Sequence, residues 1–126
     1  MRHPLNTKVL TPSAQGGESY ITVQRLTWGE RREVQRRMNE LSDAHDEAKE
    51  KDKGSTLEAY NEALYKFIFE HLVSWSWVGD DGKQMPLPKS TADITDYRDE
   101  EIKELLEIGS SLIRGNLTFT EVDKGN

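Results

Sequence analysis

The chain of 126 residues contains no cysteine, which excludes disulfide bonds, thiol catalysis and zinc or iron–sulfur sites built on cysteine. It also lacks any run of about 18 apolar residues, so no segment is expected to span a membrane. Residues 1–20 have no apolar stretch of the kind found in secretory signals, which favours the cytoplasm. Apolar residues make up only 34% of the chain and charged residues 32%, whereas ordinary soluble domains are about 25% charged. We therefore expect a single domain whose core is thin for its length.

Positive charge is in short supply, and the excess negative charge is concentrated in one segment. The chain has 17 basic and 23 acidic residues, a net charge of −6. Residues 91–107 alone carry two basic and seven acidic side chains, 2 − 7 = −5. General nucleic-acid binding is not expected, because phosphate contacts need clustered Lys and Arg. The strongest hint of such binding is a group of arginines interleaved with glutamates, which indicates a solvated helix face instead: Arg31, Arg32, Arg36 and Arg37.

The two ends of the chain read as flexible segments around one domain. Residues 1–18 are rich in Pro, Gly and small polar residues and predict a flexible N-terminal arm. Residues 19–26 are rich in β-branched and aromatic types and predict a short strand. This strand has no obvious local partner, so we expect it to pair with a distant segment or with another subunit. Residues 116–126 predict a polar C-terminal tail, which leaves residues 19–115 as a single, mostly helical domain.

Capping patterns predict three helices. Thr27 and Glu30 fit a capping box at the start of the first helix, and Gly54 is expected to end it. Ser55 is expected to cap the second helix with Glu58, and the third is expected from near Asp96 to a stop at Gly115, with acidic residues in its first turn. Between the last two, Asp81-Gly82 predicts a turn in either a small hairpin or an irregular loop. The fold class expected is therefore mainly α, a small three-helix domain with a short N-terminal strand.

The second helix is apolar over an unusually wide arc. One stripe suffices to meet two neighbouring helices, and we expect it to form the core: Leu57, Leu64, Ile68, Leu72 and Trp75. A second stripe, formed by Tyr65, Phe69 and Val73, lies further round the helix, and the apolar faces of the other helices are too narrow to cover it. Tryptophan is enriched at protein interfaces, although a core position for the tryptophans is an equal alternative. We therefore predict these partner-binding residues: Tyr65, Phe69, Val73, Trp75 and Trp77.

No motif predicts catalysis, a metal or a cofactor. The histidines His3, His45 and His71 have no partners at a ligand spacing, and His71 is expected to be a core or interface residue with a satisfied hydrogen bond. The segment Gly79–Lys83 lacks the ligand pattern of a cation loop and the flanking residues of a phosphate loop, so it is expected to be a polar turn. We expect no enzymatic activity.

The order of features along residues 19–114 is nevertheless distinctive. A strand-like segment beginning Tyr20-Ile-Thr-Val runs into a helix at Thr27-Trp-Gly-Glu. An aromatic helix then ends in Trp75-Ser-Trp-Val-Gly-Asp-Asp-Gly-Lys-Gln-Met-Pro-Leu-Pro, and Ile94-Thr-Asp-Tyr-Arg-Asp-Glu-Glu-Ile opens the last helix. In this order the chain resembles the small tail assembly chaperones of long-tailed bacteriophages.

The resemblance implies a mostly helical, non-enzymatic protein of the host cytoplasm. Such proteins coat the long helical tape measure protein before the tail tube polymerises around it, recruit the tail tube subunit, and leave before the virion is finished. It also implies self-association, and it assigns no binding residues. Two other functions stay open at this point. One is a structural virion protein of the tail or head–tail joint, in which the strand at 19–26 locks into neighbours. The other is a small DNA-binding regulator that uses the first helix.

Overall fold

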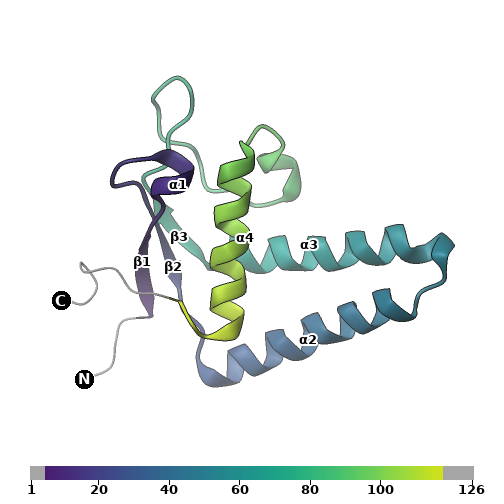
Figure 1. Cartoon of the computed structure of the whole chain (residues 1–126). Coiled ribbons are helices and arrows are strands. Elements are labelled where there is room, and N and C mark those ends of the chain that lie inside the picture. The colour runs from purple at the N-terminus through teal and green to yellow at the C-terminus, as the bar shows by residue number, and fades with distance from the viewer. Residues whose placement is uncertain (1–4, 118–126) are drawn as a thin grey trace.

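The computed structural model describes residues 5–117, and within them the chain forms one antiparallel sheet and several helices. The sheet has three strands in the order β1-β2-β3, which are Asn6–Leu10, Tyr20–Gln24 and Leu72–Trp75. Helix α4 (Asp99–Arg114) lies beside the sheet, and helices α2 (Trp28–Glu47) and α3 (Lys53–His71) project to one side as a long hairpin (Figure 1). The expected mainly α, three-helix fold is therefore wrong, because the chain is mixed α/β. The strand predicted at 19–26 is confirmed as β2.

The strand β3 explains part of this difference. We expected the second helix to continue to Trp75, but α3 ends at His71 and the chain turns at once into β3. In the segment Val73-Ser74-Trp75-Ser76-Trp77, serine and tryptophan alternate with the period of a strand. Trp75 and Trp77 are both buried while Ser74 is exposed. The predicted helix therefore ends early, because residues 72–75 form a strand, which has a two-residue period and not the 3.6-residue period of a helix.

The strand β1 is the second difference. Residues 1–18 were expected to form a flexible arm, yet Asn6–Leu10 pairs along its length with β2, from Asn6 opposite Gln24 to Leu10 opposite Tyr20. Helix α1 (Pro12–Gln15) follows, and Thr7 and Thr11 are 1% and 0% exposed. Residues 1–4 lie outside the described residues, as does most of the expected tail, 118–126. The central strand β2 thus pairs within its own chain on both sides.

The core lies where α3 and α4 meet the sheet. Buried apolar residues from all three contribute to it: Ile21, Val23, Ile68, Leu72, Trp75, Leu105, Ile108 and Leu112. Gly109 lets α4 approach α3 closely, since a Cβ built on it would lie 2.5 Å from Cγ1 of Ile68. A larger residue at 109 would separate the two helices.

The helix ends follow their local signals in part. The Thr27–Glu30 capping box is confirmed at the start of α2, and Gly115 adopts φ = 74° at the end of α4, as a C-terminal glycine should. Two other predicted ends are wrong. A short 3₁₀ turn, Glu50–Asp52, leads directly into α3 at Lys53, so Ser55 is not its cap, and α2 already ends at Glu47 rather than Gly54.

The segment between β3 and α4 is an irregular loop with one bridge. Val78 pairs with Gln84 around the turn at Gly79–Gly82, and a second 3₁₀ turn, Thr91–Ile94, precedes α4. The expected polar turn at Gly79–Lys83 is confirmed. Helix α4 begins at Asp99 rather than near Asp96. Among the described residues, no helix has the length and apolar character needed to cross a membrane.

Candidate interaction surfaces

The predicted partner-binding residues do not form a surface. Phe69, Trp75 and Trp77 are 9%, 2% and 0% exposed and belong to the core, and Tyr65 is half-buried against it. Only Val73, in β3, is well exposed, at 41%. The prediction of a second, outward-facing stripe is wrong because α3 ends early and because the sheet and α4 cover it. The alternative of a core position for Trp75 and Trp77 is correct.

The two buried tryptophans connect segments that are distant in the sequence. Their rings stack with centroids 4.7 Å apart. Trp77 Nε1 donates to Thr11 Oγ1 at 3.0 Å, and Trp75 Nε1 donates to the carbonyl of Met85 at 2.8 Å. Buried tryptophans need such partners for their N–H groups. The pair therefore fixes both the segment after β1 and the loop after β3.

The hairpin of α2 and α3 carries an exposed apolar face. Leu57, Tyr60 and Leu64 follow one another at the spacing i, i+3, i+7, so they share one side of α3. Leu57 is 47% exposed, and Tyr60 and Leu64 are half-buried. At its inner end this side opens into a groove of about 330 Å³, to which Met38 and Ile113 also contribute. We call Leu57, Tyr60 and Leu64 the hairpin face; the buried Met38 and Ile113 of α4 line only the groove.

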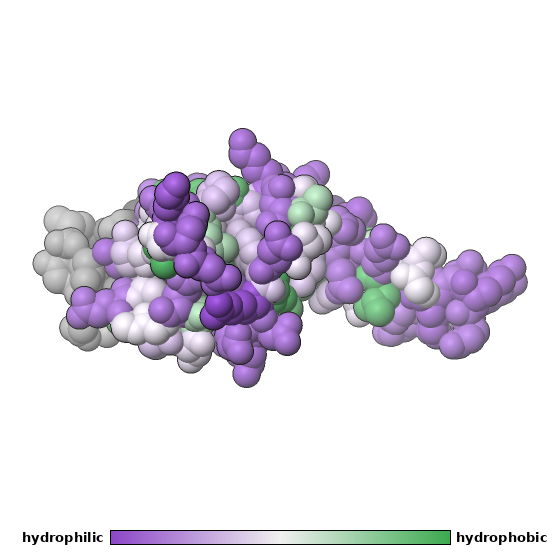
Figure 2. Space-filling model, turned by 90° about the horizontal axis from the view of Figure 1, so that it is seen from above, coloured by the Kyte–Doolittle hydropathy of each residue, from purple (hydrophilic) through white to green (hydrophobic). Residues whose placement is uncertain are grey.

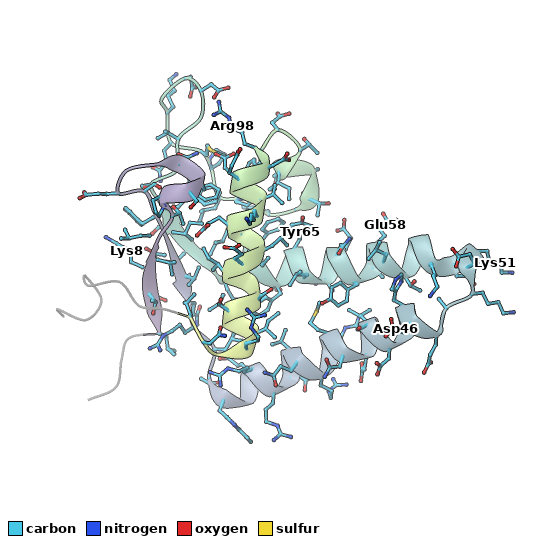
Figure 3. All side chains as sticks on the ribbon, viewed as in Figure 1. Lys8, Asp46, Lys51, Glu58, Tyr65 and Arg98 are labelled. Atoms are coloured by element: carbon cyan, nitrogen blue, oxygen red, sulfur yellow. The ribbon has the colours of Figure 1, made fainter. Side chains whose placement is uncertain are left out.

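Little of the hairpin is held by a core. Met38 is the only buried residue of α2, and the buried residues of α3 all lie between Phe67 and Phe69. Near its tip the two helices meet through polar contacts: His45 Nδ1 lies 2.8 Å from Thr56 Oγ1, and Lys53 Nζ donates to the carbonyl of His45 at 3.0 Å. Figure 3 shows the tip with charged side chains directed outward. Polar contacts of this kind contribute little net stability, so the hairpin's outer half is weakly anchored.

A tryptophan stands in solvent at the other end of α2. Trp28 is 68% exposed, and the guanidinium of Arg32 lies 4.8 Å from its ring centroid. The neighbouring Arg36 is paired with both Glu33 and Glu40, whereas Arg32 has no carboxylate partner among the described residues. We call Trp28 and Arg32 the tryptophan knob.

A cavity of about 850 Å³ lies at the N-terminal end of α4, under the loop after β3. Apolar side chains form part of its wall, among them Val78, Met85 and Leu87. The lining also includes four carboxylates and two cations: Asp80, Asp93, Asp96, Glu101, Lys89 and Arg98. We call this cavity the acidic hollow. Figure 2 looks onto this end of the molecule and shows hydrophilic residues over most of it, with few hydrophobic ones between them.

Gln15 and Glu101 give the acidic hollow a fixed floor. Gln15 exchanges two hydrogen bonds with the backbone of Val78, at 2.9 and 3.0 Å, and its amide also donates to Glu101. Glu101 is only 6% exposed and accepts the backbone N–H of Arg98 at 2.9 Å. Among the acidic residues predicted for the first turn of the last helix, Asp99 and Glu100 are exposed and Glu101 is buried. Its carboxylate closes the first turn of α4 instead.

Tyr97 lines the same hollow and has an unusually weak acidity. Burial raises its pKa to about 12, and the nearby carboxylates of Glu101 and Asp93 add to the shift. Both effects disfavour the negative phenolate.

This shift predicts how stability depends on pH at the alkaline end. The unfolded chain releases the phenolic proton near its ordinary pKa of 10, whereas the folded protein holds it to about 12. The stability that the folded state gains from keeping Tyr97 protonated is therefore complete below pH 10 and is lost as the pH rises through 12. We expect chemical denaturation at a series of pH values to show this fall, and Tyr97→Phe to reduce it. An equal fall in both proteins would contradict the assignment to Tyr97.

The histidines of the described chain take part in ordinary side-chain contacts. No group of three or more metal-binding side chains occurs among residues 5–117. His71 has its expected hydrogen bond, from Nδ1 to the carbonyl oxygen of Phe67 at 2.8 Å, and its ring packs on that of Phe67. His3 lies outside the described residues.

Sequence reasoning missed three functional candidates. Trp28 was noted only as a member of a capping box, although a large apolar residue just after a cap, outside the helix's apolar stripe, is a signal of exposure. Gln15 was assigned to the arm. Leu57 belongs to the stripe that was predicted to form the core. The sequence does not indicate how far along this helix its neighbours extend.

Comparison with known proteins supplies no neighbour: no family model matches the chain, and no curated protein or solved structure matches it.

Proposed function

We propose that this chain is a non-enzymatic tail assembly chaperone of a long-tailed bacteriophage, acting in the host cytoplasm on the tape measure protein and the tail tube subunit. The ordered features of residues 19–114 support the proposal through their resemblance to that family. The mixed α/β fold departs from the mostly helical protein that the resemblance implies, so the proposal depends on the surfaces rather than on the fold class.

The observation that carries the proposal is the hairpin face. Its apolar residues recur at i, i+3 and i+7, which is the pattern by which one helix receives another along its length. Leu57 is 47% exposed, which leaves about half of its surface open to a partner. A helical client lying along α3 would bury Leu57 and Tyr60 and place one side chain in the groove beside Ile113. Burying a leucine fully contributes about 1.5–3 kcal/mol.

The hairpin also suits a client that must later be released. The outer half of the hairpin has few buried apolar residues, and its two helices meet through polar contacts. A docked helix would therefore add apolar contacts there without disrupting a well-packed core. An element that is weakly anchored to the rest of the protein can bind a client and release it with only a small change in free energy. The tape measure protein is a long helical client of this kind.

A charge placed on the hairpin face should abolish client binding. We expect Leu57→Glu to lose co-purification with the tape measure protein encoded by the same phage, because an ionised side chain would then have to be buried at the contact. Leu57 is exposed, so circular dichroism should show an unchanged fold. The matched control is Glu58→Gln, one residue along and exposed, which should bind like the parent.

Two results would contradict the proposal. One is a tape measure protein that is equally soluble and equally free when co-expressed with and without this chain. The other is the chain itself at stoichiometric amount in purified virions, which would favour a structural tail component instead.

A further inference from the structure

The tryptophan knob and the acidic hollow lie at opposite ends of α4. Trp28 and Arg32 are in the first turns of α2, which is anchored at the C-terminal end of α4 by a hydrogen bond from Gln35 Nε2 to the carbonyl of Ile113, at 2.8 Å. The hollow surrounds Arg98 and Glu101 at the N-terminal end, and Figure 3 shows Arg98 at that end. Sixteen residues of helix separate the two sites, which is about 24 Å.

The two sites are complementary in chemistry. The knob presents an exposed indole with a guanidinium over it. The hollow offers apolar walls at Val78, Met85 and Leu87 and a net negative lining, since its four carboxylates outnumber its two cations. Its volume of about 850 Å³ is ample for an indole. Thioethers such as that of Met85 also make favourable contacts with aromatic rings.

We propose that the knob of one copy of this chain docks in the acidic hollow of the next, so that the protein assembles head to tail. A second copy is the occupant because one chain carries both halves of the contact, and the separation along α4 prevents a molecule from filling its own hollow. The dipole of α4 accounts for acidic residues at its N-terminus, but it does not account for an exposed tryptophan at the far end. Trp and Arg are the residues most enriched at the energetic centres of interfaces.

Such a contact has a structural consequence. Because the two surfaces differ, an assembly of any length leaves one knob free at one end and one hollow free at the other, and it grows as an open chain unless its rotation closes a ring. The proposal does not depend on the function proposed above, since it concerns the isolated chain and uses residues outside the hairpin face. It is tested without any client.

The experiment uses two complementary variants of the full chain. The knob variant carries Trp28→Ala and Arg32→Glu, and the hollow variant carries Val78→Lys and Asp96→Lys. All four residues are exposed, so far-UV circular dichroism should be unchanged. Sedimentation velocity of the parent protein should show concentration-dependent species beyond the dimer, weakened by added salt. Each variant alone should be monomeric, with association at least about 30-fold weaker.

Mixing the variants separates this arrangement from other kinds of self-association. The knob variant keeps an intact hollow and the hollow variant keeps an intact knob, so an equimolar mixture should form a heterodimer and nothing larger. A parent protein that stays monomeric up to millimolar concentration would overturn the proposal. So would folded variants that still assemble alone, or a mixture that forms no heterodimer, which would indicate a symmetric contact or a different surface.

Discussion

Replacing Trp77 by alanine should cost about 3–5 kcal/mol of unfolding free energy, the range for truncating a buried aromatic residue. Trp77 is fully buried, its ring stacks on that of Trp75, and its Nε1 donates to Thr11 Oγ1. The substitution would leave a cavity in the interior and remove this hydrogen bond, while Thr11 Oγ1 would keep its contact with Ser19 Oγ at 3.1 Å. Since small domains are stable by only about 5–15 kcal/mol, we expect a large shift in the denaturant midpoint measured by circular dichroism.

Trp28 provides the matched control. It is the same residue type but is 68% exposed, so Trp28→Ala should change the unfolding free energy by no more than about 0.5 kcal/mol. The two substitutions should exchange roles in assembly, where Trp28→Ala has the larger effect. Equal destabilisation by both would contradict the division between a core tryptophan and a surface tryptophan.

Enlarging Gly109 should be the other severe change. A Cβ at this position would lie 2.5 and 2.7 Å from Cγ1 and Cδ1 of Ile68, which is 1% exposed and is packed on all sides. Overpacking typically costs about 1–3 kcal/mol, and we expect Gly109→Val to reach or exceed the upper value. Gly109→Ala should cost less, because alanine regains up to about 1 kcal/mol of helix propensity. Thermal unfolding of the two variants gives the comparison.

A double-mutant cycle assigns this cost to one contact. Ile68→Ala removes both conflicting atoms, so the double variant with Gly109→Ala should be more stable than the sum of the single effects predicts, by about 0.5–3 kcal/mol. Strict additivity would mean that α3 and α4 do not meet at this point.

Signals confined to a few neighbouring residues could be read from the sequence. The capping box of Thr27 and Glu30 and the stop at Gly115 each depend on backbone groups within one turn, and both were predicted correctly. The strand β2 was predicted because its β-branched composition is local as well. Its partners were not, since pairing is decided by segments far away: β1 has weak composition signals and β3 follows an apolar helix without any spacer.

The surfaces were harder to predict for a related reason. The arc of apolar residues on α3 shows that the helix meets neighbours over much of its circumference, but not how far along its length those neighbours extend. Here α4 and the sheet cover the end near Phe69 and leave the end near Leu57 open. Leu57, which was predicted to lie in the core, is therefore exposed, and Phe69, which was predicted to lie on the surface, is buried. The acidic hollow depends on Gln15, which joins residues 63 and 86 positions away in the sequence, and no local pattern indicates such a contact.

The central claim is that the hairpin face receives a helical client, and hydrogen exchange with and without the tape measure protein tests it most directly. In the free chain, amides of the hairpin's outer half, residues 41–64, should exchange faster than those of β2 and α4, because few buried contacts hold them. Adding the client should slow exchange over residues 53–64 and leave β2 unchanged, and Leu57→Glu should abolish the protection. Unchanged exchange in the hairpin, at client concentrations where the two proteins co-sediment, would contradict the claim.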